Sequence, residues 1–588
     1  MLRIPPARRY SCSLFHLGNH PCKERSGQIA YSRVWDDRFT PIVTLLAIFA
    51  LTVMFVNPIR ETAMDDDWAY ALSVRRLLET GKYQWHDWAS ANMPFQTYWG
   101  ALWSRIAEYS FATLRLSTLF LALAGIIGIY GLAREHRMSD RSASVVALAL
   151  LSSPLYLRFS YTFMTDVPFL SCLIVSLLLY TRALRCQSYP TMLLASVTAA
   201  AAILVRQFGV ALIMGILILC LSSRQLRRNW SFVAVGIALP SIAAVWQFWS
   251  GVTKPNWAMA HYVRPLQVRY ISDVGNLVPS ILWRLSVILP YLAFFLMPLA
   301  AAVLLVFLRR RYRRESDADT LCCTPINVMA TAVPVLLVSA GLVYGVTGLN
   351  GSWLMPYLPW NLEILKPLGA ATGGVLTAFL LVGGILFGRV FIIRYIDGPG
   401  WMNLSPHERL LDWVTLFLLF FQLMFLKIGD EYLLIFLPYS LVVVARFLDG
   451  QKMPWRRWVI GAHCAVLVVS AMWVRGLLEA EEAQWLGGEH LRTQGISPQR
   501  IHGSRTWDCY YGAFNEYLAE VGTVDPHVLV DDFFSRFIPG RIHQADYLVT
   551  QLTYSPDGER WSIVEDIPYR SMLFHERHVY VAKRQGVQ

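Results

Sequence analysis

Long apolar runs recur along most of this chain, and they exclude an ordinary soluble fold. A helix needs about 20 mostly apolar residues to cross the roughly 30 Å hydrocarbon core of a bilayer. Runs near this length, some of them shorter, cover residues 40–57, 112–132, 143–161, 167–183, 191–204, 208–221, 230–249, 286–308, 327–348, 369–393, 411–427, 432–447 and 458–474. Hydrophobic residues make up 55% of the chain and charged residues only 16%. We therefore predict an all-α polytopic membrane protein with about 13 transmembrane helices.

Basic residues gather in the connections on one side of the predicted spans. These connections contain Arg134, Arg137, Arg141, Arg224, Arg227, Arg228, Arg456, Arg457 and the run from Arg309 to Arg314. Because Lys and Arg are enriched in cytoplasmic loops, the N-terminal tail, residues 1–39, is expected to be cytoplasmic. An odd number of spans then places the C-terminal region outside. The net charge of +12 is explained by this topology, and no nucleic-acid partner is expected.

The chain divides into two unequal parts. Residues 40–474 form the predicted transmembrane domain, in which residues 58–111 are the first and largest outside loop. Residues 475–588 are much less hydrophobic. They alternate a helical stretch, Tyr511 to Val521, with strand-like stretches at His527 to Val530, Tyr547 to Gln551 and His578 to Ala582. This pattern predicts a small C-terminal α/β domain.

Three consecutive carboxylates, Asp65, Asp66 and Asp67, follow the first predicted span. Adjacent like charges repel, and each carboxylate loses hydration if its surroundings are partly apolar. Such a triplet therefore requires a compensating partner: a cation, a proton to be abstracted, or a basic side chain. These requirements are typical of an active site at a membrane surface.

The residues after the triplet predict a short amphipathic helix. Tyr70, Ala71, Val74, Leu77 and Leu78 fall on one face, and Arg75, Arg76 and Glu79 fall on the other. Asp66 or Asp67 is suited to cap its N-terminus, and Gly81 is suited to end it. We expect this helix to lie in the membrane interface, with the acids at its leading end.

Further polar residues fall on the same predicted side of the membrane. They are Asp87 in the first loop, Arg115 at the mouth of the second span, Asp166 at the start of the fourth, Arg206 between the fifth and sixth, and Tyr432 near the twelfth.

The segment from Met64 to about Leu184 resembles the N-terminal half of the GT-C membrane glycosyltransferases. The resemblance is to the group with protein O-mannosyltransferases, the lipid A aminoarabinose transferase and the Rgt-type lipopolysaccharide core transferases. The matching motifs are Asp66-Asp67-Trp68-Ala69-Tyr70, Leu77 with Gly81, Leu114 to Thr118, Ser153-Pro154 and Asp166. Arg206 and the segment from Tyr432 to Pro438 match more weakly.

The chain departs from this group at two places where a cation is common. Many relatives have His or Lys before a Pro-Pro pair in the first loop, whereas this chain has Asn92-Met93-Pro94. The late Arg-Tyr pair of the group is replaced by Glu431-Tyr432. The residues that would bind the donor phosphate are therefore left open.

The resemblance implies a GT-C fold and sugar transfer from a polyprenyl-phosphate donor to a periplasmic glycan, lipid or protein at a bacterial inner membrane. Asp66 would act as the base, with Asp67 as its partner and Asp166 completing the catalytic residues. Tyr70, Asp87, Arg115, Arg206 and Tyr432 would bind substrate. A divalent metal at Asp65 and Asp66 is left open as a cofactor. The chain has no G-x-x-x-x-G-K loop for a nucleotide donor.

Each of these residues also fits a purely structural role. Asp166 is suited to cap a helix, Arg115 to snorkel from its span, and Asp87 to stabilise a loop. Alternative functions are a protein O-glycosyltransferase, a transporter or flippase of lipid-linked sugars, and an inactive scaffold. A transporter is expected to have ionisable residues in mid-span. The clustering of the acids at span ends therefore favours the enzyme.

Overall fold

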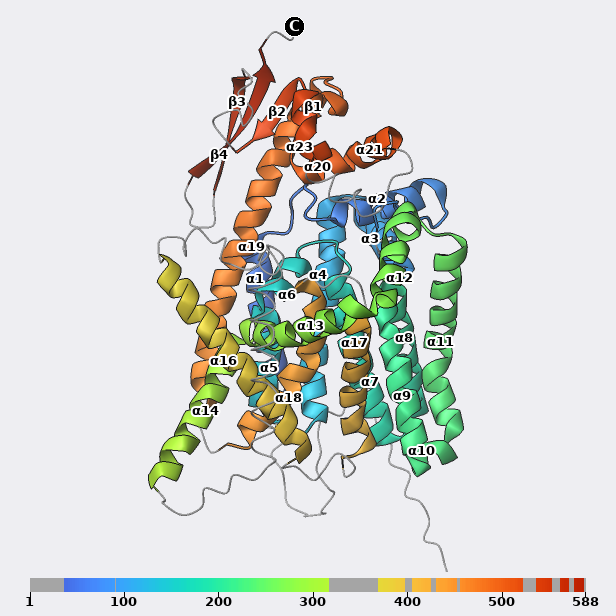
Figure 1. Cartoon of the computed structure of the whole chain (residues 1–588), viewed down its shortest axis with the longest axis vertical. Helices are drawn as coiled ribbons and strands as arrows, with labels where there is room; N and C mark the ends of the chain where they lie inside the picture. The colour runs from blue at the N-terminus through green and yellow to red at the C-terminus, as the bar shows by residue number, and fades with distance from the viewer. Residues whose placement is uncertain are drawn as a thin grey trace, which may run out of the picture.

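The computed structural model describes residues 36–89, 91–316, 369–396, 404–424, 430–451, 455–521, 536–551, 561–570 and 576–585. Within these ranges the chain forms a large bundle of helices with a small β-sheet at one end (Figure 1). The predicted span 327–348 and the predicted strand His527 to Val530 lie outside the described residues.

The first half of the bundle follows the predicted apolar runs closely. Its elements are α1 (Asp36–Val56), α2 (Asp67–Thr80), α3 (Pro94–Ala107), α4 (Phe111–Glu135), α5 (Asp140–Ser152), α6 (Pro154–Ser160), α7 (Asp166–Cys186), α8 (Tyr189–Val205), a 3₁₀ turn (Gln207–Gly209), α9 (Val210–Ser222), α10 (Arg224–Arg228) and α11 (Trp230–Thr253). The helix expected after the acidic triplet is confirmed as α2, and a second short helix, α3, follows it.

The second half of the bundle is less regular. It contains a π-helical turn (Ala258–Val263), α12 (Arg264–Ser272), α13 (Val274–Phe295), α14 (Met297–Ser316), α16 (Gly369–Ile396), α17 (Pro406–Met424), a 3₁₀ segment (Asp430–Phe436), α18 (Leu437–Asp449) and α19 (Trp455–Thr493). The predicted span 432–447 therefore begins as a 3₁₀ segment and becomes α-helical only at Leu437.

Five helices in the described ranges are long and apolar enough to cross a membrane, or up to seven if each bent pair counts as one span. Two predicted spans are sharply bent in the structure. The run 143–161 bends by 66° between α5 and α6, because Pro154 begins a new helix after Ser153. The run 286–308 bends by 103° between Ile288–Phe295 and Met297–Arg309. The described residues therefore do not establish the predicted 13 spans.

Close helix packing joins α4 to α7. Three glycines are spaced three residues apart along α4 and face α7: Gly125, Gly128 and Gly131. A Cβ atom added to Gly125 would lie 2.6 Å from the hydroxyl of Ser171. Small residues allow backbones to approach closely in membrane bundles, so these glycines fix the distance between the two helices. α7 in turn packs on α8, and α8 packs on α11.

The C-terminal region is built on the end of α19. It contains a 3₁₀ turn (Pro498–Arg500), β1 (Ile501–His502), α20 (Arg505–Tyr510), α21 (Ala513–Val521), α23 (Ile538–Gly540), a 3₁₀ turn (Arg541–His543), β2 (Tyr547–Thr550), β3 (Trp561–Arg570) and β4 (Glu576–Arg584). The sheet has the order β1-β2-β4-β3, in which only β1 and β2 are parallel. The predicted α/β character is thus confirmed within the described part of this region.

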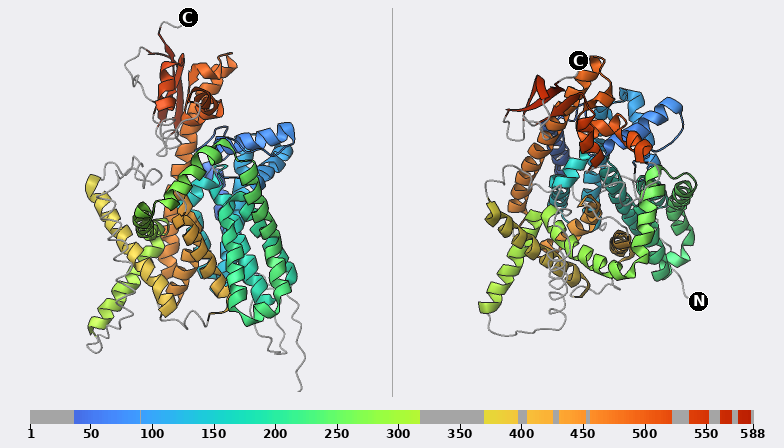
Figure 2. Two further views of the ribbon diagram at one scale, coloured as in Figure 1. Left: turned by 45° about the vertical axis from the view of Figure 1, so that its right-hand side comes forward. Right: turned by 45° about the horizontal axis from the view of Figure 1, so that its top comes forward.

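The sheet lies beyond one end of the bundle, on the last turns of α19 (Figure 2). Gly487 and Gly488 leave room there, since an added Cβ would lie 2.8 Å from Val549 and 2.7 Å from Trp507 respectively. The proposed boundary at residue 474 therefore falls inside one continuous helix. A shared apolar core unites the C-terminal elements with the first loop, including Trp68, Trp485 and Trp507.

Candidate active site

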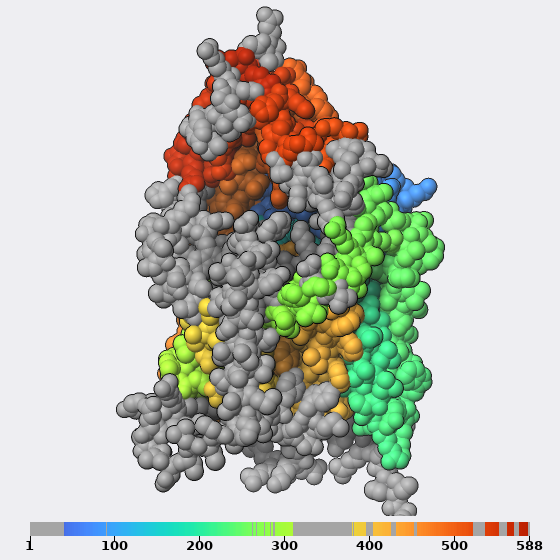
Figure 3. Space-filling model, in the orientation of Figure 1, coloured from blue at the N-terminus to red at the C-terminus, as the bar shows by residue number. Residues whose placement is uncertain are grey.

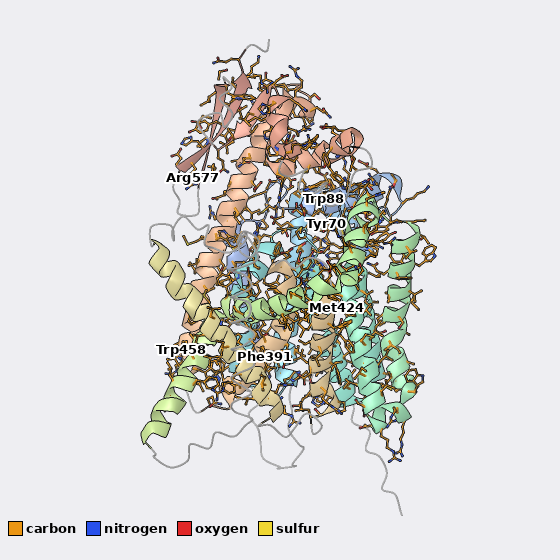
Figure 4. The ribbon with its side chains drawn as sticks, viewed as in Figure 1. Tyr70, Trp88, Phe391, Met424, Trp458 and Arg577 are labelled. Carbon is orange, nitrogen blue, oxygen red and sulfur yellow. The ribbon has the colours of Figure 1, made fainter. Side chains whose placement is uncertain are left out.

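Most of the sequence-predicted site residues lie at the end of the bundle that carries the C-terminal elements. Figure 4 shows Tyr70 of α2 and Trp88 of the following loop at this boundary. Figure 3 shows the first-loop helices, in blue, beside the orange and red C-terminal elements. The acidic triplet enters this region directly before α2.

Asp67 uses both carboxylate oxygens to shape the backbone. Oδ1 accepts a hydrogen bond from the amide of Met64 at 2.8 Å, and Oδ2 accepts one from the amide of Phe163 at 3.2 Å. The side chain is only 1% exposed. Burial raises the pKa of Asp67 to about 7, although Arg115 and the two amides act in the opposite direction. Asp67 therefore joins the start of α2 to the segment after α6.

Asp65 forms an ion pair with an arginine that sequence reasoning missed. Its Oδ1 lies 2.6 Å from Nη2 of Arg158, on α6, and both side chains are largely buried. The second oxygen, Oδ2, is also buried and has no hydrogen-bond partner among the described residues. Asp65 has φ = 54°, a backbone region that Asp tolerates better than most residues. The sequence does contain a signal for this pair, because a charged residue such as Arg158 inside the apolar run 143–161 needs a partner.

Asp66 differs from both of its neighbours. It occupies the N-cap position of α2, but its side chain makes no capping hydrogen bond, so the expected cap is wrong in this detail. It is half-buried and interacts electrostatically with Cys509 of α20. Its carboxylate is therefore close enough to α20 to act on Cys509.

Asp166 and Arg206 form a second buried ion pair. Nη2 of Arg206 lies 2.9 Å from Oδ1 of Asp166, and Nε of Arg206 donates to the hydroxyl of Thr165 at 2.7 Å. The guanidinium also lies over the ring of Tyr432, 5.1 Å from its centroid. Arg206 further interacts electrostatically with Tyr70. The structure thus brings together four residues from α2, α7, the end of α8 and the 3₁₀ segment before α18.

The two ion pairs belong to one electrostatic cluster. Asp166 interacts with Asp65 and with Glu431, in addition to its partner Arg206. The sequence predicted no role for Glu431. The cluster combines acids and arginines in a largely buried region, where such charges interact more strongly than in water.

Arg115 does not have the surroundings expected of a residue that binds phosphate. Its guanidinium donates to four backbone carbonyls: those of Tyr161 at 2.7 Å, Pro58 at 2.9 Å, Arg60 at 2.9 Å and Thr62 at 3.0 Å. It is 1% exposed. These bonds hold the segment before the triplet against the end of α6, so Arg115 is better described as a positioning residue.

Asp87 lies away from the ion pairs and stabilises a loop contact. Its Oδ1 accepts a hydrogen bond from the amide of Trp257 at 3.2 Å, and its carbonyl accepts one from Ala258 at 3.0 Å. It therefore fastens the first loop to the π-helical turn before α12.

A metal site at Asp65 and Asp66 fits poorly with these side chains. Arg158 already neutralises Asp65. Within the described ranges, no group of three or more His, Cys, Asp or Glu residues is arranged to hold a metal ion.

Residues 92–248 match the model of a family described as dolichyl-phosphate-mannose-protein mannosyltransferase. The match confirms the resemblance to the GT-C membrane glycosyltransferases. It includes Arg115, Asp166 and Arg206 but begins after the acidic triplet. No curated protein matches the chain.

Two kinds of solved structure are similar to the chain. ArnT from Cupriavidus metallidurans, bound to undecaprenyl phosphate, is 13% identical with a TM-score of 0.41, and the match covers 93% of this chain and 99% of ArnT. An oligosaccharyltransferase from Archaeoglobus fulgidus, tethered to an acceptor peptide, is 13% identical with a TM-score of 0.36. That match covers 81% of this chain and 59% of the archaeal protein.

Proposed function

We propose that the chain is an integral membrane glycosyltransferase that transfers a sugar from a polyprenyl-phosphate donor to an acceptor at the outer face of a bacterial inner membrane. The main support is the cluster of Asp65, Asp166, Arg158 and Arg206 at one end of an apolar bundle, beside Asp66. The family match supports a lipid-phosphate-linked sugar as the donor. Acids and arginines together suit a reaction that removes a proton and releases an anionic phosphate.

In the proposed mechanism, Asp66 is the general base. The acceptor hydroxyl attacks the anomeric carbon and gives its proton to the Asp66 carboxylate. The bond between that carbon and the phosphate oxygen breaks, and its electron pair leaves on the phosphate. Asp66 suits this role because it is only half-buried beside the ion pairs, whereas Asp67 is buried with both oxygens on backbone amides. General-base help of this kind contributes about 10²–10⁴-fold.

Arg206 and Arg158 are the proposed phosphate contacts. Each guanidinium is held in place by a carboxylate, Asp166 and Asp65 respectively, before substrate arrives. Fixed donors stabilise developing negative charge without reorganising during the reaction. Tyr432 and Tyr70 border Arg206 and would limit the directions from which a phosphate approaches. Asp67, Arg115 and Asp87 keep the surrounding backbone in position.

The proposed topology places this cluster and the C-terminal region in the periplasm. It rests on the enrichment of Arg in the predicted inside loops. The first loop also shares an apolar core with the C-terminal elements, so both are assigned to the same side. The proposed acceptor is a glycolipid, lipopolysaccharide or polysaccharide of the cell envelope. A protein acceptor is the second candidate, favoured by the description of the matching family.

A transfer assay tests this proposal. Purified protein in vesicles would receive radiolabelled polyprenyl-phosphate sugars and a crude envelope extract, and labelled glycan, lipid and protein would be separated. We expect label to move from the donor into one acceptor class. If no donor supports transfer but labelled lipid crosses the vesicles faster than in empty vesicles, the enzyme is rejected in favour of a flippase.

A further inference from the structure

A cavity of about 380 Å³ lies beside the candidate active site, between the first loop and the helices α8, α9, α11 and α12. Its volume is in the range of small-ligand pockets. Most of its wall is apolar and includes Ala244 and Phe248 of α11. Trp85, Asn92, Gln207, Gln247 and Arg264 also line it. None of the roles proposed above uses this cavity.

Gln247 supplies a buried polar atom without a partner. The residue is 6% exposed, and its amide Nε2 donates to the backbone carbonyl of Asn92. This bond fixes which way the amide points. Its Oε1 is buried and has no hydrogen-bond partner in the described part of the chain. A buried carbonyl oxygen without a donor is costly, so the cavity calls for a ligand with an O–H or N–H group.

The cavity adjoins the surface that faces lipid. Phe248 lines it and is 76% exposed, and the neighbouring Val252 is 49% exposed. Large apolar side chains with this exposure, on a helix suited to span a membrane, are expected to contact hydrocarbon. A ligand with a hydrocarbon chain would therefore reach the cavity from the bilayer beside α11.

The cavity also adjoins the proposed phosphate contact. Gln207 lines it and directly follows Arg206, which pairs with Asp166. A head group in the cavity would thus contact the residue next to Arg206.

We propose that this cavity binds the neutral, hydroxyl-bearing head group of a membrane lipid, such as a sugar, with Oε1 of Gln247 accepting a hydroxyl hydrogen bond. Side-chain amides, an arginine and the Trp85 ring are suited to the polar edges and apolar face of a sugar. A phosphate diester has no O–H or N–H group to offer Gln247. The head group is that of the sugar donor or that of a lipid acceptor, and naming it a substrate rests on the proposed function.

Direct binding tests the cavity independently of transfer. Purified protein in a polyoxyethylene detergent would be mixed with dodecyl glucoside, and bound probe would be counted by native mass spectrometry. The matched probe is the same glucoside with all hydroxyls methylated. We expect saturable binding of one glucoside and at least tenfold weaker binding of the methylated probe. Equal binding of the two probes, or no saturable binding, would overturn the assignment.

Two variants locate the probe, and a third serves as their control. Gln247→Leu removes the acceptor atom and is expected to weaken glucoside binding about tenfold without affecting the methylated probe. Ala244→Trp fills the cavity and is expected to abolish binding of both. Val245→Trp, on the same helix, changes a side chain that is 69% exposed and outside the cavity lining, so it should bind as wild type. Wild-type binding by Ala244→Trp would place the probe elsewhere and overturn the proposal.

The transfer assay then identifies the source of the head group. A raised KM for the donor alone in Gln247→Leu would assign the cavity to the donor sugar, and a raised KM for the acceptor alone would assign it to a lipid acceptor. Both results support the site. Unchanged KM for both substrates would overturn its role in transfer. If wild type transfers no sugar, the proposed function fails while the binding result stands.

Discussion

At the scale of single residues, three adjacent carboxylates have three different environments. Asp65 is neutralised by Arg158, Asp67 is bound to two backbone amides, and Asp66 is half-buried beside α20. The sequence predicted that the negative charges of the triplet need partners. The structure shows such partners for Asp65 and Asp67. It could not predict which acid has which partner, because Arg158 and Phe163 are almost a hundred residues away.

Asp67 should make stability depend on pH. Its carboxyl has a pKa near 3.8 in the unfolded chain and about 7 when folded, so only the folded state holds this proton between those values. The contribution of Asp67 to stability is therefore fully present below about pH 4 and is lost at about 1.4 kcal/mol per pH unit until about pH 7. Asp67→Asn should remove this contribution. The measurement is the apparent unfolding temperature of the purified protein from pH 4 to 8.

The exposed Glu79→Gln variant is the control for Asp67→Asn, since Glu79 is a surface acid of the same helix. It should keep the wild-type pH profile. An Asp67→Asn profile parallel to wild type would show that Asp67 is ionised throughout this range.

Arg115→Lys should reduce stability more than substrate affinity. Lysine keeps the charge but loses the planar fork that reaches four carbonyls, so we expect a cost of about 2–4 kcal/mol. The measurement pairs the unfolding temperature with KM for the lipid donor. Arg75→Lys, at an exposed ion pair on α2, is the matched control and should change little. Unchanged stability with a raised KM would instead make Arg115 a substrate contact.

At the scale of elements, local patterns were reliable and bends were not. The amphipathic helix after the triplet is confirmed as α2, ending at Gly81 with φ = 69°. The sharp bend at Leu296 was missed because the apolar run continues through it without interruption. Strand β3, Trp561–Arg570, was also missed, whereas its neighbour β4 matches a predicted strand. Strand pairing depends on distant partners, which a local pattern does not contain.

Gly488→Ala should loosen the packing of α20 on α19. A Cβ at this position of α19 would lie 2.7–2.9 Å from three ring atoms of Trp507, which is fully buried. Overpacking of this kind costs about 1–3 kcal/mol. The measurement is the rate of limited proteolysis in the C-terminal region. Gly461→Ala, in the same helix, meets no atom within 4 Å and should be neutral or slightly stabilising. Equal proteolysis of the two variants would show that the C-terminal region does not depend on this contact.

At the scale of the whole molecule, the apolar runs and the gathering of polar residues at one end were predictable. Span ends bring Asp166, Arg206 and Tyr432 to the same face whatever the details of packing, and the structure places them in contact. The attachment of the C-terminal region was not predictable, because it depends on α19 continuing to Thr493 and on an apolar core shared with the first loop.

The proposed topology has a direct test with reporter fusions. Alkaline phosphatase, active only in the periplasm, should be active when fused after Thr493 and inactive when fused after Arg228. A fluorescent protein that matures only in the cytoplasm should give the opposite result at both positions. High phosphatase activity after Arg228 would contradict the orientation based on the basic loops.

The most direct test of the account is the effect of Asp66→Asn on sugar transfer. The substitution keeps the size of the side chain but removes the proposed base, so transfer should fall by about 10²–10⁴-fold with normal expression and folding. Glu79→Gln, at the exposed end of the same helix, should retain wild-type activity. Transfer by Asp66→Asn at the wild-type rate would contradict the proposed base and the mechanism built on it.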